Sequence, residues 1–443
     1  MRIGLLLVVV ACGDNAAPPA QVHDGFLHDA LGRARIMRGV NLSGSHKYAP
    51  YLDDKTPADY TRLRADWGFN AARFVMTWAA VEPQPGVYDD AYLDRVAERL
   101  AWADAAGITV VLDMHQDIYG EGFGFDGAPR WTCDEARYAA FEPKEPWFVN
   151  ATDPNVVACV DGFYERPELR AAFAAAWRHV AERLHDQPAV VGFDVLNEPN
   201  WGSYPLFAFE RERLGPFYAE VVPPVREVAP HWVAFLEPSA SRNGGISTTL
   251  EVAAFADVMY APHSYDTMAE SGGGFDPARR QLIVDNVADL AREANLLEAG
   301  LWIGEYGGVA TNPGIVEYMT AQYDAAGAVA ASTMYWAYDK GDGYSLLDAD
   351  GNEKPVLLGA LVRPYPERVA GTPIAYGFDA GVFTVTYTPD RGITAPTLIA
   401  VPARVYPSGF TVDCGDCTYE ITAGQLAITQ PPSGSTATIT VRP

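Results

Sequence analysis

Residues 190–199 read Val-Val-Gly-Phe-Asp-Val-Leu-Asn-Glu-Pro, an apolar run that ends in an amide, a carboxylic acid and a proline. A run of this length and character is typical of a strand buried on both faces of a parallel sheet. In a (β/α)8 barrel, the residues that follow such strands lie at the edge that carries catalytic groups. We therefore interpret Asn197 and Glu198 as candidate site residues at the end of a barrel strand.

A second apolar run ends in the same way. Residues 301–304 read Leu-Trp-Ile-Gly, and Glu305 follows them directly. Two carboxylic acids at the ends of parallel strands suit a reaction that needs both a nucleophile and an acid or base on one bond. The alternative is that Glu198 and Glu305 are rim carboxylates in unrelated ion pairs, and the surrounding residues decide between the two interpretations.

Short β-like runs alternate with helix-like stretches from about residue 30 to residue 365, which is the pattern of parallel α/β folds. We predict an α/β fold in which residues 30–365 form a (β/α)8 TIM barrel and residues 366–443 form a C-terminal antiparallel β-sandwich domain. The long connection from residue 118 to 166 is rich in glycine, proline and aromatic residues and is expected to form a wall of the cleft. The eight predicted strands cover residues 36–42, 71–77, 109–114, 190–196, 232–236, 258–261, 301–304 and 333–337.

The N-terminus carries the three parts of a signal peptide in order. Residues 1–12 read Met-Arg-Ile-Gly-Leu-Leu-Leu-Val-Val-Val-Ala-Cys, with one positive charge, an apolar stretch and a small residue before Cys12. The ending resembles a lipoprotein box, in which Cys12 would be lipidated. We predict a lipoprotein-type signal peptide over residues 1–12, a tether over residues 13–29, and an exported protein that is a bacterial cell-envelope lipoprotein or is secreted. An ordinary export signal and a wrongly assigned start codon are the alternatives.

Four further cysteines remain after Cys12. An oxidising compartment makes disulfide bonds between them plausible. Cys133 and Cys159 lie in the same long connection, and Cys414 and Cys417 are close enough in sequence to close a tight turn. We predict both disulfides, because a zinc site at the second pair would need another ligand pair that the sequence does not offer.

Composition narrows the class of partner. Of the 443 residues, 49% are hydrophobic and 20% are charged, which is typical of a globular protein. The net charge of −25 argues against nucleic acid or an anionic membrane surface as a partner that the protein reaches electrostatically. A neutral substrate is favoured, and we expect a monomer for which membrane contact by a lipid anchor is possible.

Polar and aromatic side chains stand at the ends of six of the eight predicted strands. Each has a structural alternative, such as a hydrogen-bonded core histidine or a buried ion pair, but their joint occurrence favours one site. A metal site built from His115 with Asp113 and Asp117 is a further alternative, and we predict no metal and no cofactor. The set is Arg73, Asp113, His115, Asp117, Asn197, Glu198, His263, Tyr265, Glu305 and Trp336.

On these residues the chain resembles glycoside hydrolase family 5 over roughly residues 36–340. Within that family it resembles the endoglycoceramidases, because Leu-Asp-Met-His-Gln-Asp-Ile-Tyr-Gly at residues 112–120, the long third connection and the appended β-sandwich are typical of that group. The motifs that carry the family resemblance are Leu196-Asn-Glu-Pro199, Ile303-Gly-Glu-Tyr-Gly307, Ala72-Arg-Phe74 with Trp78, Pro262-His-Ser-Tyr265 and Tyr335-Trp336.

The resemblance implies a retaining mechanism in which Glu305 is the nucleophile and Glu198 is the acid/base. Arg73 and Tyr265 would keep the Glu305 carboxylate ionised by lowering its pKa, and His263 would orient Glu198. The remaining residues would hold the sugar, with Asn197 at its 2-hydroxyl and Trp336 as a platform. The implied substrate-binding set is Lys47, Arg73, His115, Asp117, Asn197, His263, Tyr265 and Trp336.

The implied substrate is a glycosphingolipid cut between the glycan and ceramide, so one side of the cleft is expected to be apolar. The alternatives are another family 5 β-glycosidase that acts on glucan, mannan or a simple steryl glucoside, and a non-catalytic glycan-binding lipoprotein. The retention of both Glu198 and Glu305 argues against the second alternative. Candidate aromatic residues for the apolar wall are Phe123, Phe125, Trp131, Trp147, Phe148, Trp201, Tyr204, Phe207 and Phe209.

Overall fold

A computed structural model describes residues 21–42, 44–341 and 343–443. The predicted signal peptide with Cys12, and residues 13–20 of the predicted tether, lie outside the described residues.

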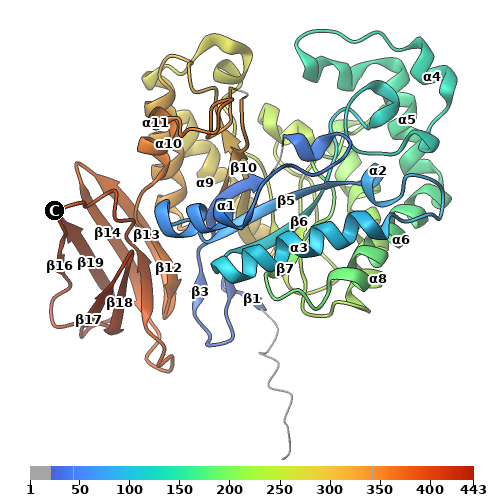
Figure 1. Ribbon diagram of the computed structural model, residues 1–443. Helices are drawn as coiled ribbons and strands as arrows, with labels where there is room; N and C mark the ends of the chain where they lie inside the picture. The colour runs from blue at the N-terminus through green and yellow to red at the C-terminus, as the bar shows by residue number, and fades with distance from the viewer. Residues whose placement is uncertain (1–20, 43, 342) are drawn as a thin grey trace, which may run out of the picture.

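Eight parallel strands close into a barrel in the order β10-β11-β4-β5-β6-β7-β8-β9 (Figure 1). Each of the eight predicted runs contains or overlaps one of these strands, so the predicted TIM barrel is confirmed. The strands are β4 (Arg38–Leu42), β5 (Ala71–Thr77), β6 (Thr109–His115), β7 (Val190–Asp194), β8 (Val233–Leu236), β9 (Val258–Tyr260), β10 (Gly300–Gly307) and β11 (Ser332–Tyr338).

The barrel strands are buried on both faces, which explains their continuous apolar sequences. Every residue of β5 is buried, for example, because the barrel interior covers one face and helices cover the other. The helices of the barrel and its loops are α1 (Pro57–Thr61), α2 (Trp78–Val81), α3 (Asp90–Ala106), α4 (Glu135–Ala140), α5 (Pro154–Glu165), α6 (Pro167–Leu184), α7 (Leu206–Phe209), α8 (Gly215–Arg226), α9 (Arg280–Leu296), α10 (Ile315–Ala328) and α11 (Pro355–Leu361).

Helix α3 shows how local sequence sets the boundaries of these elements. The Asp89 side chain accepts a hydrogen bond of 2.8 Å from the backbone N–H of Tyr92, which caps the first turn. Gly107 ends the helix with φ 73°, a left-handed conformation that glycine adopts without a steric penalty. The helix therefore delivers the chain into β6, whose far end carries site residues.

The connection between β6 and β7 is better ordered than its sequence pattern suggests. It contains α4, α5 and several short 3-10 turns. In Figure 1 this part of the chain forms the lobe at the upper right. A disulfide joins Cys133 to Cys159 across this connection, with the two Cα atoms 5.6 Å apart. We refer to residues 118–166 as the third loop.

The C-terminal region forms two antiparallel sheets beside α10 and α11 (Figure 1). The four-stranded sheet has the order β13-β14-β19-β16, and the seven-stranded sheet has the order β1-β2-β3-β12-β15-β18-β17. A second disulfide joins Cys414 to Cys417. The strands are β12 (Tyr365–Val369), β13 (Gly371–Asp379), β14 (Val382–Pro389), β15 (Thr397–Ala400), β16 (Thr411–Asp413), β17 (Thr418–Thr422), β18 (Gln425–Gln430) and β19 (Ala437–Arg442).

The larger sheet also recruits the start of the described chain, and here the structure differs from the prediction. Strands β1 (Gln21–His23) and β2 (Phe26–His28) lie within the predicted tether, and β3 (Ala34–Arg35) pairs with β12. The physical reason is burial, because Leu27 is 1% exposed and packs with Trp302 beneath the barrel. The tether can therefore extend no further than residue 20.

The two parts of the molecule are joined by specific contacts. Tyr365 donates its hydroxyl to the carbonyl of Gly68 at 2.8 Å, and Arg64 Nη2 donates to both carboxylate oxygens of Glu367 at 3.0 Å.

Among the helices of the described ranges, none combines the length and the apolar character needed to cross a membrane.

We expect the third-loop disulfide to stabilise the fold more than the C-terminal one. The first spans a sequence separation of 26 and the second a separation of 3, which corresponds to roughly 3.5 and roughly 1.6 kcal/mol in the loop-entropy relation. The double variant Cys133→Ser/Cys159→Ser should therefore melt at a lower temperature than Cys414→Ser/Cys417→Ser, as measured by differential scanning calorimetry. Equal melting temperatures for the two double variants would contradict the expectation that the third-loop disulfide stabilises the fold more.

Candidate active site

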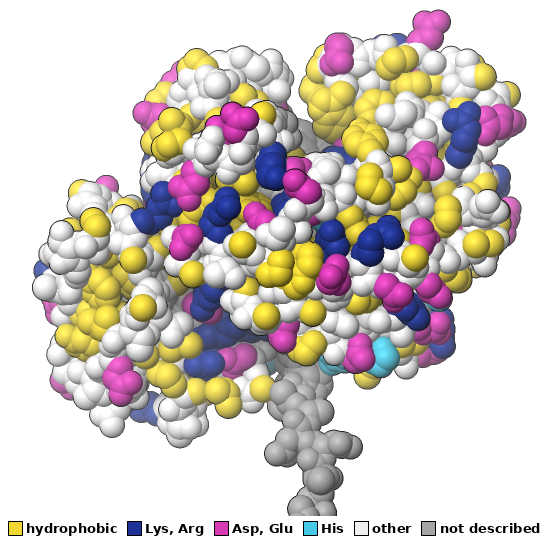
Figure 2. All heavy atoms as spheres, viewed as in Figure 1, with side chains coloured by type: hydrophobic (Ala, Val, Ile, Leu, Met, Phe, Trp, Pro, Cys, Tyr) yellow, Lys and Arg dark blue, Asp and Glu magenta, His cyan; other side chains and the backbone are white. Residues whose placement is uncertain are grey.

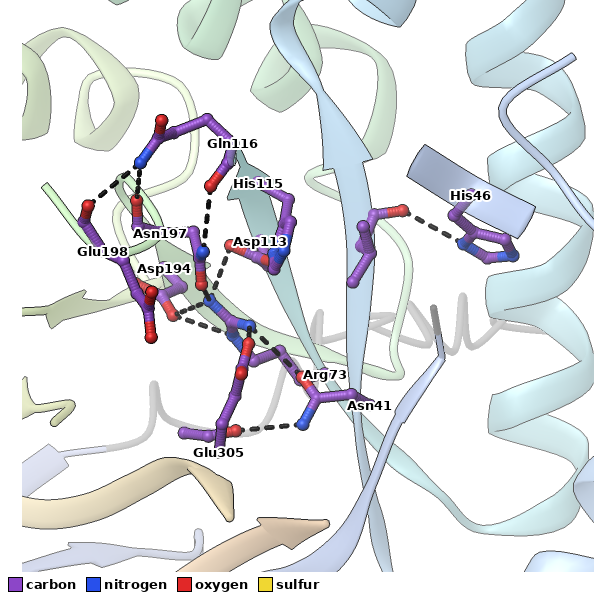
Figure 3. A network of polar contacts seen from close by, with 12 residues as sticks. Asn41, His46, Arg73, Asp113, His115, Gln116, Asp194, Asn197, Glu198 and Glu305 are labelled. Atoms are coloured by element: carbon purple, nitrogen blue, oxygen red, sulfur yellow. Dashed lines mark hydrogen bonds and ion pairs between the residues drawn. The ribbon is translucent and has the colours of Figure 1, made fainter. Parts of the chain in front are cut away.

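Arg73 lies at the centre of the polar network at the C-terminal ends of the barrel strands (Figure 3). It projects from β5, its side chain is fully buried, and Nη1 donates to Glu305 Oε1 at 2.7 Å. Its Nη2 donates to Asn197 Oδ1 and to Glu237 Oε1, both at 2.9 Å, and its Nε donates to Asp194 Oδ2 at 2.9 Å. One guanidinium on β5 therefore contacts the C-terminal ends of three other barrel strands, β7, β8 and β10.

The two predicted catalytic carboxylates face each other across His263. The Tyr265 hydroxyl donates to Glu305 Oε2 at 2.9 Å, and His263 Nδ1 lies 2.7 Å from Glu198 Oε1 and 3.6 Å from Glu305 Oε2. One oxygen of each carboxylate and the imidazole nitrogen all lie within 4.8 Å of one another. This close spacing is that of a retaining pair, because an inverting pair is separated by roughly 6.5–9.5 Å to admit water.

Glu198 adopts a backbone conformation that is uncommon for a residue other than glycine, with φ 41°. Hydrogen bonds on both sides hold this turn. Gln116 Nε2 donates to the carbonyls of Asn197 and Glu198 at 2.8 and 2.9 Å, and the backbone N–H of Glu198 donates to Glu237 Oε2 at 2.8 Å. Local strain of this kind persists only where the surroundings fix it, and it is common at active sites.

The ionisation of the two carboxylates differs from the prediction that Arg73 keeps the pKa of Glu305 low. Burial raises the pKa of Glu305 and outweighs the opposing charges of His263 and Arg73. Burial also acts to raise the pKa of Glu198, but hydrogen bonds from His263 and Asn243 outweigh it, so this pKa falls below its ordinary value. The physical reason is that His263 donates to Glu198, whereas Arg73 divides its charge among several acids.

His263 lies between the two glutamates, and its pKa is raised. Burial acts to lower the pKa of His263, but the charges of Glu237 and Glu305 and the hydrogen bond to Glu198 raise it well above its ordinary value. The imidazolium therefore stands between the two candidate catalytic groups, one short hydrogen bond from Glu198.

A second group of predicted residues lies on the side of the cleft formed by β6, β11 and the turn Ser45–Lys47. Lys47 forms an ion pair with Asp117, and its Nζ lies 4.6 Å from the ring centre of Trp336. The His115 ring stacks on Trp336 at 5.2 Å, and its Nδ1 lies 2.7 Å from Asp113 Oδ2. Burial and the charge of Lys47 lower the pKa of His115 well below its ordinary value, so this imidazole is neutral.

The contacts of Asn197 bear on its predicted role at the sugar 2-hydroxyl, and those of Asp113 and Asp117 bear on the alternative metal site. Asn197 is 1% exposed, and its amide accepts from Arg73 and donates to the carbonyl of Gln116 at 3.1 Å, so much of its hydrogen-bonding capacity serves the protein. Both carboxylate oxygens of Asp113 already have partners, Oδ1 in Arg73 and Oδ2 in His115. Oδ2 of Asp117 contacts Lys47. Asp113 is therefore not free to bind a metal ion together with His115 and Asp117.

Sequence reasoning missed three residues that hold the catalytic groups. Glu237 follows β8 directly, so the same strand-end argument could have found it. Asn243 donates to Glu198 Oε1 at 2.7 Å from the short helix Ala240–Gly244, where no strand end marks it. Gln116 lies between two predicted residues but was not predicted to act.

The aromatic wall is only partly as predicted. Phe123 and Phe209 are buried in the core, because Phe123 packs against Tyr138 and Phe141 within the third loop and Phe209 packs against Tyr164 of α5. Trp147 and Phe148 are each 45% exposed and Phe207 is 68% exposed. Hydrophobic side chains gather on the surface of the third-loop lobe (Figure 2). The other predicted wall residues are partly buried: Phe125, Trp131, Trp201 and Tyr204.

A (β/α)8 barrel with paired carboxylates at the ends of two of its strands, a buried arginine and a tryptophan beside them defines a class of retaining glycosidases. The comparisons with known proteins agree. Residues 30–342 match the model of the family described as "Cellulase (glycosyl hydrolase family 5)", and residues 363–442 match the glycoside hydrolase family 5 C-terminal domain. The chain therefore belongs to glycoside hydrolase family 5 and is a glycoside hydrolase.

Several relatives are similar over almost the whole chain. Endoglycoceramidase I from Rhodococcus hoagii (strain 103S) is 29% identical over 459 residues, which cover 94% of this chain and 86% of that protein. The structure of endo-glycoceramidase II from Rhodococcus sp. in complex with ganglioside GM3 is 33% identical, with a TM-score of 0.85, and covers 94% of this chain and 99% of that chain. The structure of the lactosyl-enzyme intermediate of the same protein has a TM-score of 0.84 at 33% identity, with the same coverage.

We expect the activity to require the several hydrogen-bond donors of the Arg73 guanidinium as well as its positive charge. Arg73→Lys keeps the positive charge but has fewer donors in a different geometry, so at least one buried acceptor loses its partner. This change should lower kcat/KM on an aryl β-glycoside by roughly 100-fold and lower the melting temperature. Arg178→Lys, at a 40% exposed ion pair on α6, is the matched control and should change neither value. Equal kcat/KM for the two variants would refute the role of Arg73.

Proposed function

We propose that this chain is a retaining endo-β-glycosidase that hydrolyses the bond between the intact glycan and ceramide of glycosphingolipids. Glu305 is the nucleophile and Glu198 is the acid/base. The observation that carries the proposal is the similarity over 94% of the chain to a structure described with ganglioside GM3, together with the paired carboxylates that this chain places around His263.

The geometry supports a two-step reaction. The Glu305 carboxylate attacks the anomeric carbon while the bond from that carbon to the ceramide oxygen breaks. Glu198, acting as the acid, supplies a proton to the leaving oxygen. Water then attacks the anomeric carbon, Glu198 accepts its proton, and the bond to Glu305 breaks. Because His263 Nδ1 lies 2.7 Å from Glu198, the proton delivered in the first step can be held by this pair.

The polar side of the cleft suits the sugar. Lys47 and Asp117 offer a donor and acceptors for hydroxyl groups, and Trp336 offers an aromatic face on which a sugar ring can stack. The neutral imidazole of His115 lies beside Trp336 and can exchange hydrogen bonds with the same ring.

The apolar side suits the lipid. Trp147 and Phe148 on the third loop and Phe207 on α7 are large hydrophobic side chains that remain exposed. The loop of α7 and the third loop are tied together, because Asn200 Nδ2 donates to the carbonyl of Ala151 at 3.1 Å. Exposed aromatic patches of this kind often contact lipids or partner proteins.

For export, we propose that residues 1–12 are a lipoprotein-type signal peptide and that Cys12 is lipidated. The proposal rests on the order of charged, apolar and small residues before Cys12. Metabolic labelling of the full chain with a palmitate analogue, in cells that express either the parent or Cys12→Ser, tests it.

We expect the protein lacking residues 1–20 to release the intact disaccharide and ceramide from lactosylceramide. Mass spectrometry of the products distinguishes this result from the alternatives. Cleavage of a soluble β-glucan alone would place the protein among polysaccharide hydrolases, and release of single sugars would indicate an exo-acting glycosidase. No product from either substrate would support the glycan-binding alternative.

We expect Glu305→Gln to lose turnover of aryl β-lactosides by more than about 10⁴-fold without losing its fold, because the amide cannot form the glycosyl ester. A fluorinated lactoside that traps the covalent intermediate should add its mass to the peptide containing Glu305 in the parent protein. Glu142→Gln, at an exposed site on the third loop, is the control and should keep full activity. A label on any other residue would contradict the assigned nucleophile.

A further inference from the structure

Asp126 is a buried acid of the third loop that sequence reasoning did not single out. It is 1% exposed, and neither of its carboxylate oxygens has a hydrogen-bond donor among the residues that the structure describes. An oxygen of Asp126, an oxygen of Asp117 and a ring nitrogen of His115 lie within 4.8 Å of one another. A buried ionised carboxylate without a donor is costly, so a group in this position keeps its proton and donates it to a neighbour.

We propose that Asp126 is a positioning residue that holds Asp117 through a shared proton. The protonated carboxyl of Asp126 donates to Asp117, and Asp117 also accepts from Lys47. This arrangement fixes the lysine and the aspartate that face the sugar. The inference rests on the sugar-binding role of Lys47 and Asp117 in the proposed function, but it does not depend on ceramide as the leaving group.

The backbone is built to bring the two acids together. Directly after Asp117, Ile118 and Tyr119 have φ 55° and 94°, and a positive φ is a clear outlier for a β-branched isoleucine. The chain then loops out and returns, so that the N–H of Asp117 donates to the carbonyl of Asp126 at 3.1 Å and the N–H of Ala128 donates to the carbonyl of Tyr119 at 2.8 Å. Such strain persists where other contacts fix it, and here it places Asp126 beside Asp117.

The surrounding charges agree with a protonated Asp126. Burial raises its pKa well above the ordinary value, the charge of Asp117 adds to this effect, and the charge of Lys47 opposes it. The other titratable groups that face this cluster are His115, which is neutral, and Tyr48, whose pKa is raised by burial and by Asp126. When the pH rises through the pKa of Asp126, two carboxylates would share one ammonium, and their repulsion would displace Asp117.

Steady-state kinetics on a soluble 4-nitrophenyl β-lactoside test the inference across neutral to alkaline pH. Asp126→Ala should raise KM about tenfold with a smaller change in kcat, because a hydrogen bond that positions a charged group is lost. Asp126→Asn keeps a donor and should recover most of that loss. In the parent protein KM should rise toward alkaline pH, and Asp126→Asn should not show this rise, because an amide does not ionise.

Two outcomes would overturn the inference. Equal KM values for the alanine and asparagine variants would show that a donor at this position does not hold Asp117. Identical pH profiles of KM for the parent and Asp126→Asn would show that ionisation of Asp126 does not displace Asp117. If Asp126→Ala does not fold, the comparison of the parent with Asp126→Asn still decides. A protein that cleaves the aryl lactoside but not lactosylceramide would refute the proposed substrate and leave this test valid.

Discussion

The active site depends on the burial of one guanidinium. Arg73 has no contact with solvent, and its donors reach Glu305, Asn197, Glu237 and Asp194. Burying a single charge is unfavourable unless hydrogen bonds and opposite charges compensate it, and here the compensating groups come from the ends of several different strands. The requirement to satisfy Arg73 therefore fixes the register of those strand ends relative to one another. It also places the nucleophile candidate within reach of His263.

The strand ends achieve this arrangement through unfavourable backbone conformations at specific points. Glu198 has φ 41° directly after Asn197, and Ile118 has φ 55° directly after Asp117. Glu198 is itself one of the two candidate catalytic carboxylates, and Ile118 follows Asp117, which pairs with Lys47. Hydrogen bonds to neighbouring loops hold both turns. A regular strand would send alternate side chains to opposite faces, whereas these turns direct adjacent side chains toward one cleft.

The barrel could be predicted from the sequence because parallel strands are buried on both faces and appear as continuous apolar runs. The residues at their ends followed from the same rule, which found Arg73, Glu198 and Glu305. Asn243 could not be found in this way, since it reaches Glu198 from a short helix whose position depends on tertiary packing. The pairing of β1 and β2 with the C-terminal sheet was missed for a similar reason, because strands of three residues have too little sequence to show a period.

The pKa of Glu305 was predicted to be low because the inference considered only its contacts with Arg73 and Tyr265, whereas burial raises this pKa. Acids outnumber cations in this site, and burial raises the pKa values of Asp113, Asp194 and Asp126 well above their ordinary value. The pKa of His263 is also raised well above its ordinary value, because the charges of Glu237 and Glu305 and the hydrogen bond to Glu198 outweigh burial. Carboxyl groups gathered in this way suit the positive charge that develops at the anomeric carbon in an oxocarbenium-like transition state. The excess of carboxylates, which is costly for folding, is thus the feature that matches the charge of the reaction.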